Sequence, residues 1–176
     1  MRKLGNAFGA FALALLIVAA ASSGCRGGGG AGADEAPPAG ADVKVIAHGE
    51  EVDLAAHLAA GKTTVFDFYA PWCPPCRVLG PALERLAAAQ PDRLAIRKVD
   101  IVDWTTPVVT QHGIEALPHL VLYDATGRVV ADGDKVYPEL ERLFGDAAKD
   151  VIRAGTGEDT ARPAEGTRAA DGTQAL

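Results

Sequence analysis

The sequence predicts an α/β fold in which a central mixed β-sheet is covered by helices on both faces. In the first part of the chain, short β-branched and aromatic stretches alternate with helical patterns, which is typical of parallel strands joined by helices. In the second part, two short apolar stretches flank a turn that contains Gly127, and an amphipathic helix follows. This part predicts an antiparallel hairpin, so the sheet is expected to contain both kinds of strand pairing.

Each element follows from a local pattern. A strand over 43–47 is followed by a short helix over 53–60, with Asp53 as its N-cap. The stretch 64–70 ends at Pro71 and predicts a buried strand. The later predicted elements are a helix after Cys73 kinked by Pro81, a strand over 94–101, a helix over 107–112 that ends at Gly113, hairpin strands over 120–124 and 129–131, and a helix over 139–152.

The segment Trp72-Cys73-Pro74-Pro75-Cys76 places two thiols one helical turn apart, directly after the predicted buried strand. Proline suits the first helical position, so Cys73 is predicted to be the N-cap. There the unpaired N–H groups and the helix dipole favour a thiolate over a thiol. We therefore expect Cys73 to be exposed, ionised near neutral pH and nucleophilic, with Cys76 as the resolving thiol.

Two other interpretations of the cysteine pair stay open. A CxxC segment can be half of a zinc site, but the one remaining cysteine, Cys25, lies far away in the sequence, and we expect no metal. A purely structural disulfide is the second alternative. Its loop is so small that it would constrain the unfolded chain very little.

Over about residues 43–152 the chain resembles the thioredoxin family. The resemblance rests on two motifs and on Pro81, and these motifs are Asp67-Phe68-Tyr69-Ala70-Pro71-Trp72-Cys73-Pro74-Pro75-Cys76-Arg77 and Gly113-Ile114-Glu115-Ala116-Leu117-Pro118. It implies a thioredoxin fold and thiol-disulfide exchange. Cys73 would attack a partner disulfide, and Cys76 would then attack Cys73 to release the reduced partner.

Asp67 matches the buried carboxylate of the family. A lone carboxylate in a strand core has a raised pKa, so this group is expected to exchange the proton of Cys76 near neutral pH. The resemblance places Lys98 beside Asp67. A purely structural ion pair between Asp67 and Lys98 stays open as the alternative.

The resemblance also assigns the surface around the cysteines. Pro118 matches the cis proline of the family, which would expose the backbone of Leu117 to an extended partner chain. Trp72 is expected to shape this docking surface, whereas Trp104 is expected to pack on the sheet. His119 stands where the family usually has a small polar residue. Protonated His119 would stabilise the Cys73 thiolate, although a half-exposed strand histidine with no such role is the alternative.

The N-terminal residues 1–24 resemble an export signal, with Arg2 and Lys3 before an apolar run of about 14 residues, short for a membrane span of about 20. The segment that ends at Cys25 resembles the lipobox of bacterial lipoproteins, so Cys25 is expected to carry lipid; ordinary cleavage near Ala21 is the alternative. Residues 25–41 are then a flexible linker, 42–152 the thioredoxin domain and 153–176 a disordered tail.

The formal net charge of the 176-residue chain is −6, which argues against nucleic acid as a partner. We expect an exported thiol-disulfide oxidoreductase in the bacterial periplasm or cell envelope that reduces disulfides of exported proteins without a bound cofactor. A membrane thiol relay is the implied electron donor. A disulfide oxidant or isomerase, or a non-catalytic peptide-binding module, is the alternative.

Overall fold

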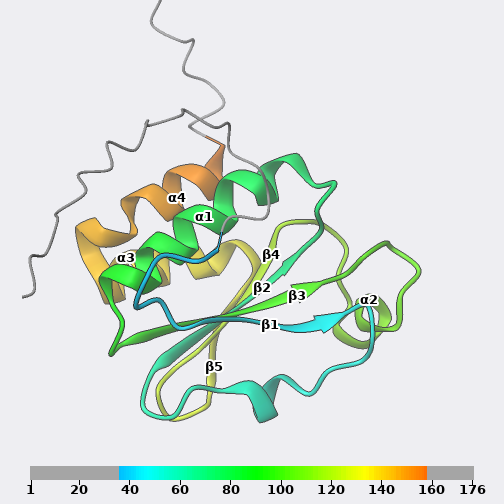
Figure 1. The fold of residues 1–176 in the computed structure, drawn as a ribbon, viewed down its shortest axis with the longest axis horizontal. Helices are drawn as coiled ribbons and strands as arrows, with labels where there is room; N and C mark the ends of the chain where they lie inside the picture. The colour runs from blue at the N-terminus through cyan, green and yellow to red at the C-terminus, as the bar shows by residue number, and fades with distance from the viewer. Residues whose placement is uncertain (1–35, 158–176) are drawn as a thin grey trace, which may run out of the picture. The chain divides into compact units, whose positions relative to one another are not determined.

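A computed structural model of the chain describes residues 36–157 (Figure 1). Its five-stranded sheet has the order β1-β3-β2-β4-β5. Strands β1, β3 and β2 are parallel, whereas β4 runs antiparallel to β2, and β5 runs antiparallel to β4. The strands span Val43–His48 (β1), Thr63–Tyr69 (β2), Leu94–Asp100 (β3), His119–Tyr123 (β4) and Val129–Asp132 (β5). The predicted mixed sheet is confirmed.

Four α-helices and three 3₁₀ helices accompany the strands in the described part of the chain. The α-helices span Pro74–Ala89 (α1), Pro107–His112 (α2), Val136–Phe144 (α3) and Lys149–Thr156 (α4). The 3₁₀ helices span Leu54–His57 (η1), Gly133–Lys135 (η2) and Gly145–Ala148 (η3). The order of strands and helices is that of a thioredoxin fold.

Side chains alternate along β2 between two apolar clusters on opposite faces of the sheet. Val65 lies in the cluster that includes residues of α1, α3 and α4. Phe66 and Phe68 lie in the second cluster, which includes residues of α2 and both cysteines. Figure 1 shows α1, α3 and α4 together on one side of the sheet. Because side chains alternate between the two faces, β2 contributes apolar side chains to both clusters, and helices cover both faces of the sheet.

Two predicted helix ends are confirmed. The side chain of Asp53 accepts a hydrogen bond of 3.0 Å from the backbone N–H of Ala55 and so caps the short helix, which is 3₁₀ and ends at His57, earlier than predicted. Gly113 ends α2 with a φ of 63°, a left-handed conformation that favours glycine.

The single helix predicted over 139–152 is wrong. Gly145 adopts φ 56° and ψ −133° and ends α3, and the 3₁₀ helix η3 separates α3 from α4. A residue without a Cβ adopts this backbone conformation easily, so the helical periodicity on both sides of Gly145 concealed a break.

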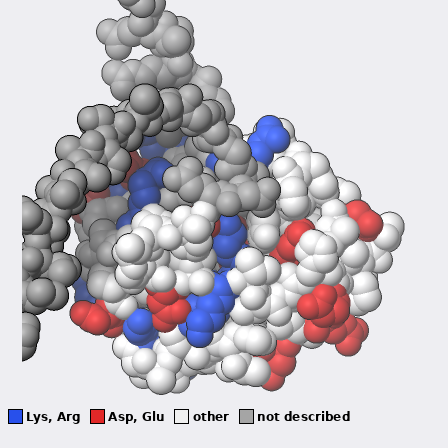
Figure 2. Space-filling view, viewed as in Figure 1, with Lys and Arg blue, Asp and Glu red and all other residues white. Residues whose placement is uncertain are grey.

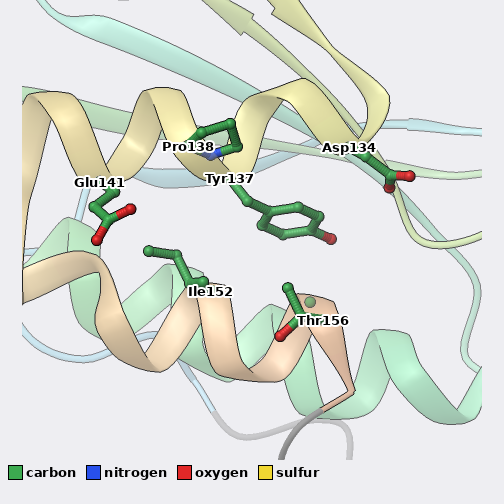
Figure 3. A pocket seen from close by; sticks show the side chains of 7 residues that line it. Asp134, Tyr137, Pro138, Glu141, Ile152 and Thr156 are labelled. Atoms are coloured by element: carbon green, nitrogen blue, oxygen red, sulfur yellow. The ribbon is translucent and has the colours of Figure 1, made fainter.

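The break lets α4 fold back along α3 (Figure 3). The ring of Tyr137 lies directly against Gly155, where a Cβ would overlap it. A pocket of about 530 Å³ lies beside this contact, and its lining consists of Asp134, Tyr137, Pro138, Glu141, Ile152, Gly155 and Thr156. The lining contains none of the predicted site residues.

The predicted domain limits need one correction. Helix α4 continues to Thr156, so the predicted tail begins inside a helix. At the other end, Asp42 already forms ion pairs with Arg97 (2.9 Å) and Lys62 (3.1 Å). The export signal, Cys25 and most of the predicted linker and tail lie outside the described residues. Among residues 36–157, no helix combines the length and the apolar character that crossing a membrane requires.

Charged side chains of both signs lie on the face drawn in Figure 2. Asp and Glu gather toward the right of that face, and Lys and Arg lie nearer its middle.

Candidate functional site

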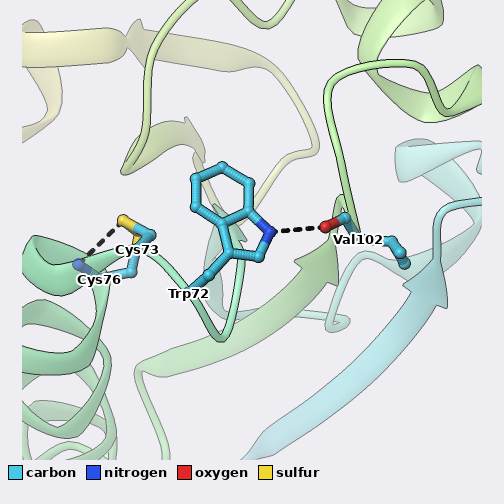
Figure 4. The surroundings of a disulfide bond; sticks show 4 residues. All are labelled: Trp72, Cys73, Cys76 and Val102. Carbon is cyan, nitrogen blue, oxygen red and sulfur yellow. Dashed lines mark hydrogen bonds between the residues drawn. A yellow bond between two sulfur atoms is a disulfide. The ribbon is translucent and has the colours of Figure 1, made fainter.

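The two cysteines lie where β2 gives way to α1. Cys73 is the N-cap of α1, and its Sγ accepts a hydrogen bond of 3.2 Å from the backbone N–H of Cys76 (Figure 4). Cys73 and Cys76 form a disulfide, with their Cα atoms 5.3 Å apart. The predicted N-cap position of Cys73 is confirmed, as is the pairing of the two sulfurs.

The two prolines limit which donors reach Cys73. Pro74 and Pro75 occupy the first two positions of α1 and have no N–H group. Cys76 carries the first N–H group of the helix, and this group donates the hydrogen bond to Sγ of Cys73. A thiolate at position 73 is therefore stabilised by this hydrogen bond and by the positive end of the helix dipole.

Cys73 is less exposed than we expected. In the disulfide form Cys73 is 3% exposed and Cys76 is 6% exposed, so the expectation of an exposed Cys73 is wrong for this form. Their chain neighbours Trp72, Pro74 and Pro75 are exposed. The disulfide therefore lies directly beneath the surface, and a partner's sulfur has to approach it between these neighbours.

Trp72 is fixed beside the disulfide by a hydrogen bond. Its side chain is 48% exposed, and Nε1–H donates to the carbonyl oxygen of Val102 at 2.6 Å (Figure 4). Val102 has a φ of 61°, which is uncommon for a β-branched residue. The carboxylate of Asp100 accepts the N–H of Val102 at 2.8 Å and holds this turn in place. Trp72 and the turn at Val102 thus form one rim of the site.

Trp104 belongs to the same rim. It is 45% exposed, and its ring centroid lies 5.9 Å from that of Trp72. The expectation that Trp104 packs on the sheet is therefore wrong. The sequence around it carries no signal of this contact, because the hydrogen bond from Trp72 that brings this turn to the cysteines joins residues 30 positions apart.

The segment before β4 reaches the same cluster. The Leu117–Pro118 bond is cis, as expected from the resemblance. Leu117 packs against the apolar cluster that contains both cysteines. His119 packs its ring on Phe68 of that cluster, and its Nε2 lies 2.8 Å from Oδ1 of Asp132 on β5. The described contacts of His119 are thus with Phe68 and Asp132, and its effect on the Cys73 thiolate stays a prediction.

Asp67 is a buried carboxyl group in the middle of β2. It is 2% exposed, and its Oδ1 has no hydrogen-bond partner. Burial raises the pKa of Asp67 to about 6, because removal from water disfavours the charged form. The charge of Lys98 opposes this rise in the pKa, and the charge of Glu84 adds to it. A carboxyl group with this pKa can accept or release a proton near neutral pH.

Lys98 is not the direct ion-pair partner of Asp67. The two residues are register neighbours on β3 and β2, but Nζ of Lys98 lies 2.7 Å from Oε1 of Glu84 on α1. The same ammonium group lies 4.8 Å from the centroid of the Tyr69 ring. The expected Asp67–Lys98 ion pair is therefore wrong, because a second carboxylate that faces the same space from α1 binds the ammonium group.

Residues 36–157 contain no group of three His, Cys, Asp or Glu side chains arranged to hold a metal ion. The predicted site contains the disulfide and the buried carboxyl group. The carboxyl group lies within β2, and the disulfide lies at the start of α1, which follows this strand in the chain.

A comparison with protein families places this arrangement in a known class, thiol-disulfide proteins with a CxxC pair at the start of a helix. The thioredoxin family profile matches residues 45–142, which is more than half of the chain. The chain belongs to the thioredoxin family. As a member of this family with a Cys73–Cys76 disulfide, it is a thiol-disulfide oxidoreductase.

Curated relatives agree with this assignment. Thioredoxin-T of Drosophila melanogaster is 31% identical over 110 residues, which is 58% of this chain and 69% of the relative. A thioredoxin-like protein of Fusarium culmorum is 35% identical over 95 residues, which is 52% of this chain and 78% of the relative. Mitochondrial thioredoxin of Mus musculus is 38% identical and covers 46% of this chain, with about half of its own length (51%) matched.

The chain is also similar to solved structures of thioredoxins. Thioredoxin f2 of Chlamydomonas reinhardtii is 27% identical with a TM-score of 0.40, and the match covers 49% of this chain and 82% of that one. Spinach chloroplast thioredoxin f in its short form is 24% identical with a TM-score of 0.45, covering 62% and 95%.

The raised pKa of Asp67 predicts a stability change in Asp67→Asn. Because folding raises this pKa from 3.8 to about 6, the folded protein binds the proton more tightly, and stability falls as pH rises across that range. The difference corresponds to about 3 kcal/mol at pH 7 and above. We expect the oxidised variant to be more stable than wild type by up to about this amount above pH 6, and by almost nothing below pH 4.

Urea unfolding of both oxidised proteins at several pH values measures this difference. Glu51→Gln removes one negative charge at an exposed position and serves as the control. A stability difference that is independent of pH would contradict the assigned titration of Asp67.

Proposed function

We propose that this protein reduces disulfides of exported proteins through Cys73 and Cys76. The observation that carries the proposal is the Cys73–Cys76 disulfide at the N-terminus of α1, where Sγ of Cys73 accepts a hydrogen bond from the backbone N–H of Cys76. Leu117, which precedes the cis bond to Pro118, packs against the apolar cluster that contains both cysteines. In the reduced protein, the Cys73 thiolate attacks one sulfur of the partner disulfide, and the other partner sulfur leaves as a thiolate that takes a proton from solvent.

The second half of the reaction regenerates the disulfide. Cys76 loses its proton and attacks Sγ of Cys73, which releases the second partner sulfur. The partner gains two electrons and two protons. Both electrons come from the two cysteines, Cys76 releases one proton, and solvent supplies the other because Cys73 reacts as a thiolate. Asp67 is the proposed acceptor of the Cys76 proton, because its pKa of about 6 leaves it ionised near pH 7 yet basic enough to react.

The partner is proposed to dock as an extended chain along Leu117. The backbone next to a cis proline is available to pair with such a chain, as in strand addition. Trp72 directly precedes Cys73 in the sequence, and its side chain is exposed. His119 lies at the start of β4, in reach of the same segment. These residues set which disulfides the site accepts.

The direction of the reaction depends on the reduction potential. Potentials of thiol-disulfide proteins span about 150 mV, equivalent to about 7 kcal/mol for two electrons. We favour reduction because the segment between Cys76 and Pro118 follows the plain thioredoxin pattern, with no inserted domain. The rival proposals are an oxidant or isomerase and a peptide-binding module without turnover.

We also propose that the protein is exported and tethered by lipid at Cys25, in the bacterial periplasm or cell envelope. The support is the charged and apolar pattern before Cys25 and the Gly/Ala-rich segment after it. With Cys25 joined to lipid, the redox pair would be the sole pair of free thiols in the chain. A membrane thiol relay is the proposed electron donor.

Insulin reduction tests the mechanism. With dithiothreitol as electron source, we expect wild type to accelerate precipitation of the reduced insulin chains, and Cys73→Ser to lose this acceleration entirely. Cys76→Ser should form a stable mixed disulfide with its partner, because the resolving thiol is missing. Cys25→Ser is the matched control and should keep full activity. Activity that survives in Cys73→Ser would rule out the mechanism, and an inactive wild type would favour a binding module.

Equilibration with glutathione tests the direction. In a glutathione buffer with a reduction potential of about −200 mV, a reductase keeps its Cys73–Cys76 disulfide because its own potential is lower. The disulfide of an oxidant, whose potential is higher, is reduced in the same buffer. We expect the disulfide to persist, as read by alkylation and mass spectrometry. A pair found mostly reduced in this buffer would assign the protein to the oxidants or isomerases.

Fractionation of expressing bacteria tests the tether. We expect the full chain in the membrane fraction and labelled by a fatty-acid probe, and Cys25→Ser unlabelled and released from the membrane. A single acyl chain binds membranes only marginally, but the diacylated, N-acylated cysteine of lipoproteins binds them stably. An unlabelled wild type would favour ordinary signal cleavage.

A further inference from the structure

We propose that Glu84 is a positioning residue for thiol-disulfide exchange. Its carboxylate binds the Lys98 ammonium group and so prevents it from pairing with the buried Asp67 carboxyl group. The inference rests on the proposed role of Asp67 as acceptor of the Cys76 proton.

The geometry starts from helix α1. Cys76, Gly80 and Glu84 are spaced four residues apart and therefore lie along one face of the helix. Gly80 leaves room on this face: a Cβ there would lie 3.5 Å from Nζ of Lys98. The ammonium group thus passes over Gly80 and ends at Glu84, two turns along the helix from the resolving cysteine.

Lys98 is within reach of two carboxyl groups. It is the register neighbour of Asp67 across β3 and β2, and side chains at such positions point to the same face of the sheet. Its ammonium group nevertheless lies 2.7 Å from Glu84, with the Tyr69 ring on another side. The side chains of Lys98 and Glu84 are 17% and 13% exposed, so their attraction is only weakly screened by water.

The charges that act most strongly on Asp67 come from β3 and α1. Lys98 faces it from β3 and Glu84 from α1. Tyr137 on α3 also senses Asp67, since the carboxylate charge contributes to raising the Tyr137 pKa to about 12. The register partner on β4, Leu120, is apolar. The balance at Asp67 is therefore set mainly by burial and by how completely Glu84 engages the lysine.

This arrangement has a chemical consequence. A carboxylate in direct contact with an ammonium group has a lowered pKa and is a weak base. Since Glu84 engages the ammonium group, Asp67 keeps a pKa of about 6 and takes the proton as Cys76 attacks Cys73. The proton leaves Asp67 again for solvent when the partner is released.

Two opposite substitutions test the inference without turnover. In the oxidised protein, the carboxyl carbon of Asp67 is titrated by NMR. Glu84→Gln should lower the midpoint, because a negative charge is lost and Lys98 is free to turn to Asp67. Lys98→Met should raise it, because the opposing positive charge is lost. Glu51→Gln removes a charge at an exposed position and should leave the midpoint where it is in wild type.

The reduced protein provides the second measurement. In insulin reduction, Glu84→Gln should move the acid limb of the pH profile to lower pH and reduce the rate at pH 7 about two- to fivefold, because Asp67 becomes a weaker base. Glu84→Asp keeps the charge and should restore most of the rate. A folding defect alone would lower the rate without moving the acid limb.

A midpoint unchanged in Glu84→Gln, or midpoints that move in the same direction in Glu84→Gln and Lys98→Met, would overturn the inference. Should Glu84→Gln fail to fold, Glu84→Asp and Lys98→Met still decide it, since only the latter should move the midpoint substantially. Loss of insulin reduction in wild type would instead refute the proposed function, while the titration in the oxidised protein would still report on Glu84.

Discussion

The strand–helix junction at Cys73 is the constraint on which the site depends. Strand β2 is buried, so its end is fixed, and the chain turns through Pro71 and Trp72 into α1. This turn places a sulfur atom where a side-chain oxygen usually caps a helix. The sulfur caps the helix by accepting the backbone N–H of Cys76, and the same N–H stabilises negative charge on the sulfur. Capping of the helix and stabilisation of negative charge on Cys73 therefore use one hydrogen bond.

Local patterns predicted those features that local physics determines. The N-cap role of Cys73 follows from the proline at the next position, and the αL end of α2 follows from Gly113. The break at Gly145 and the hydrogen bond from Trp72 to Val102 were not predicted. The first is hidden by helical periodicity on both sides of one glycine, and the second joins residues 30 positions apart.

The partner of Lys98 was missed for a similar reason. Strand pairing correctly places Lys98 beside Asp67, and the thioredoxin resemblance adds no other acid. Glu84 reaches the ammonium group only because α1 packs over the sheet and Gly80 leaves space. The signal present in the sequence is the four-residue spacing from Cys76 through Gly80 to Glu84, which becomes informative once the packing of α1 is known.

Burial of Asp67 affects both the stability of the fold and the basicity of the carboxylate. The carboxyl group sits among apolar residues with one oxygen unsatisfied, which destabilises the folded state. A direct ion pair with Lys98 would relieve part of this cost but would also lower the pKa of Asp67 and make it a poor base. Binding the ammonium group to Glu84 instead keeps a positive charge near enough to limit the destabilisation and leaves Asp67 able to take a proton. The position of one lysine side chain between two carboxyl groups thus couples the stability of the core to the basicity of Asp67.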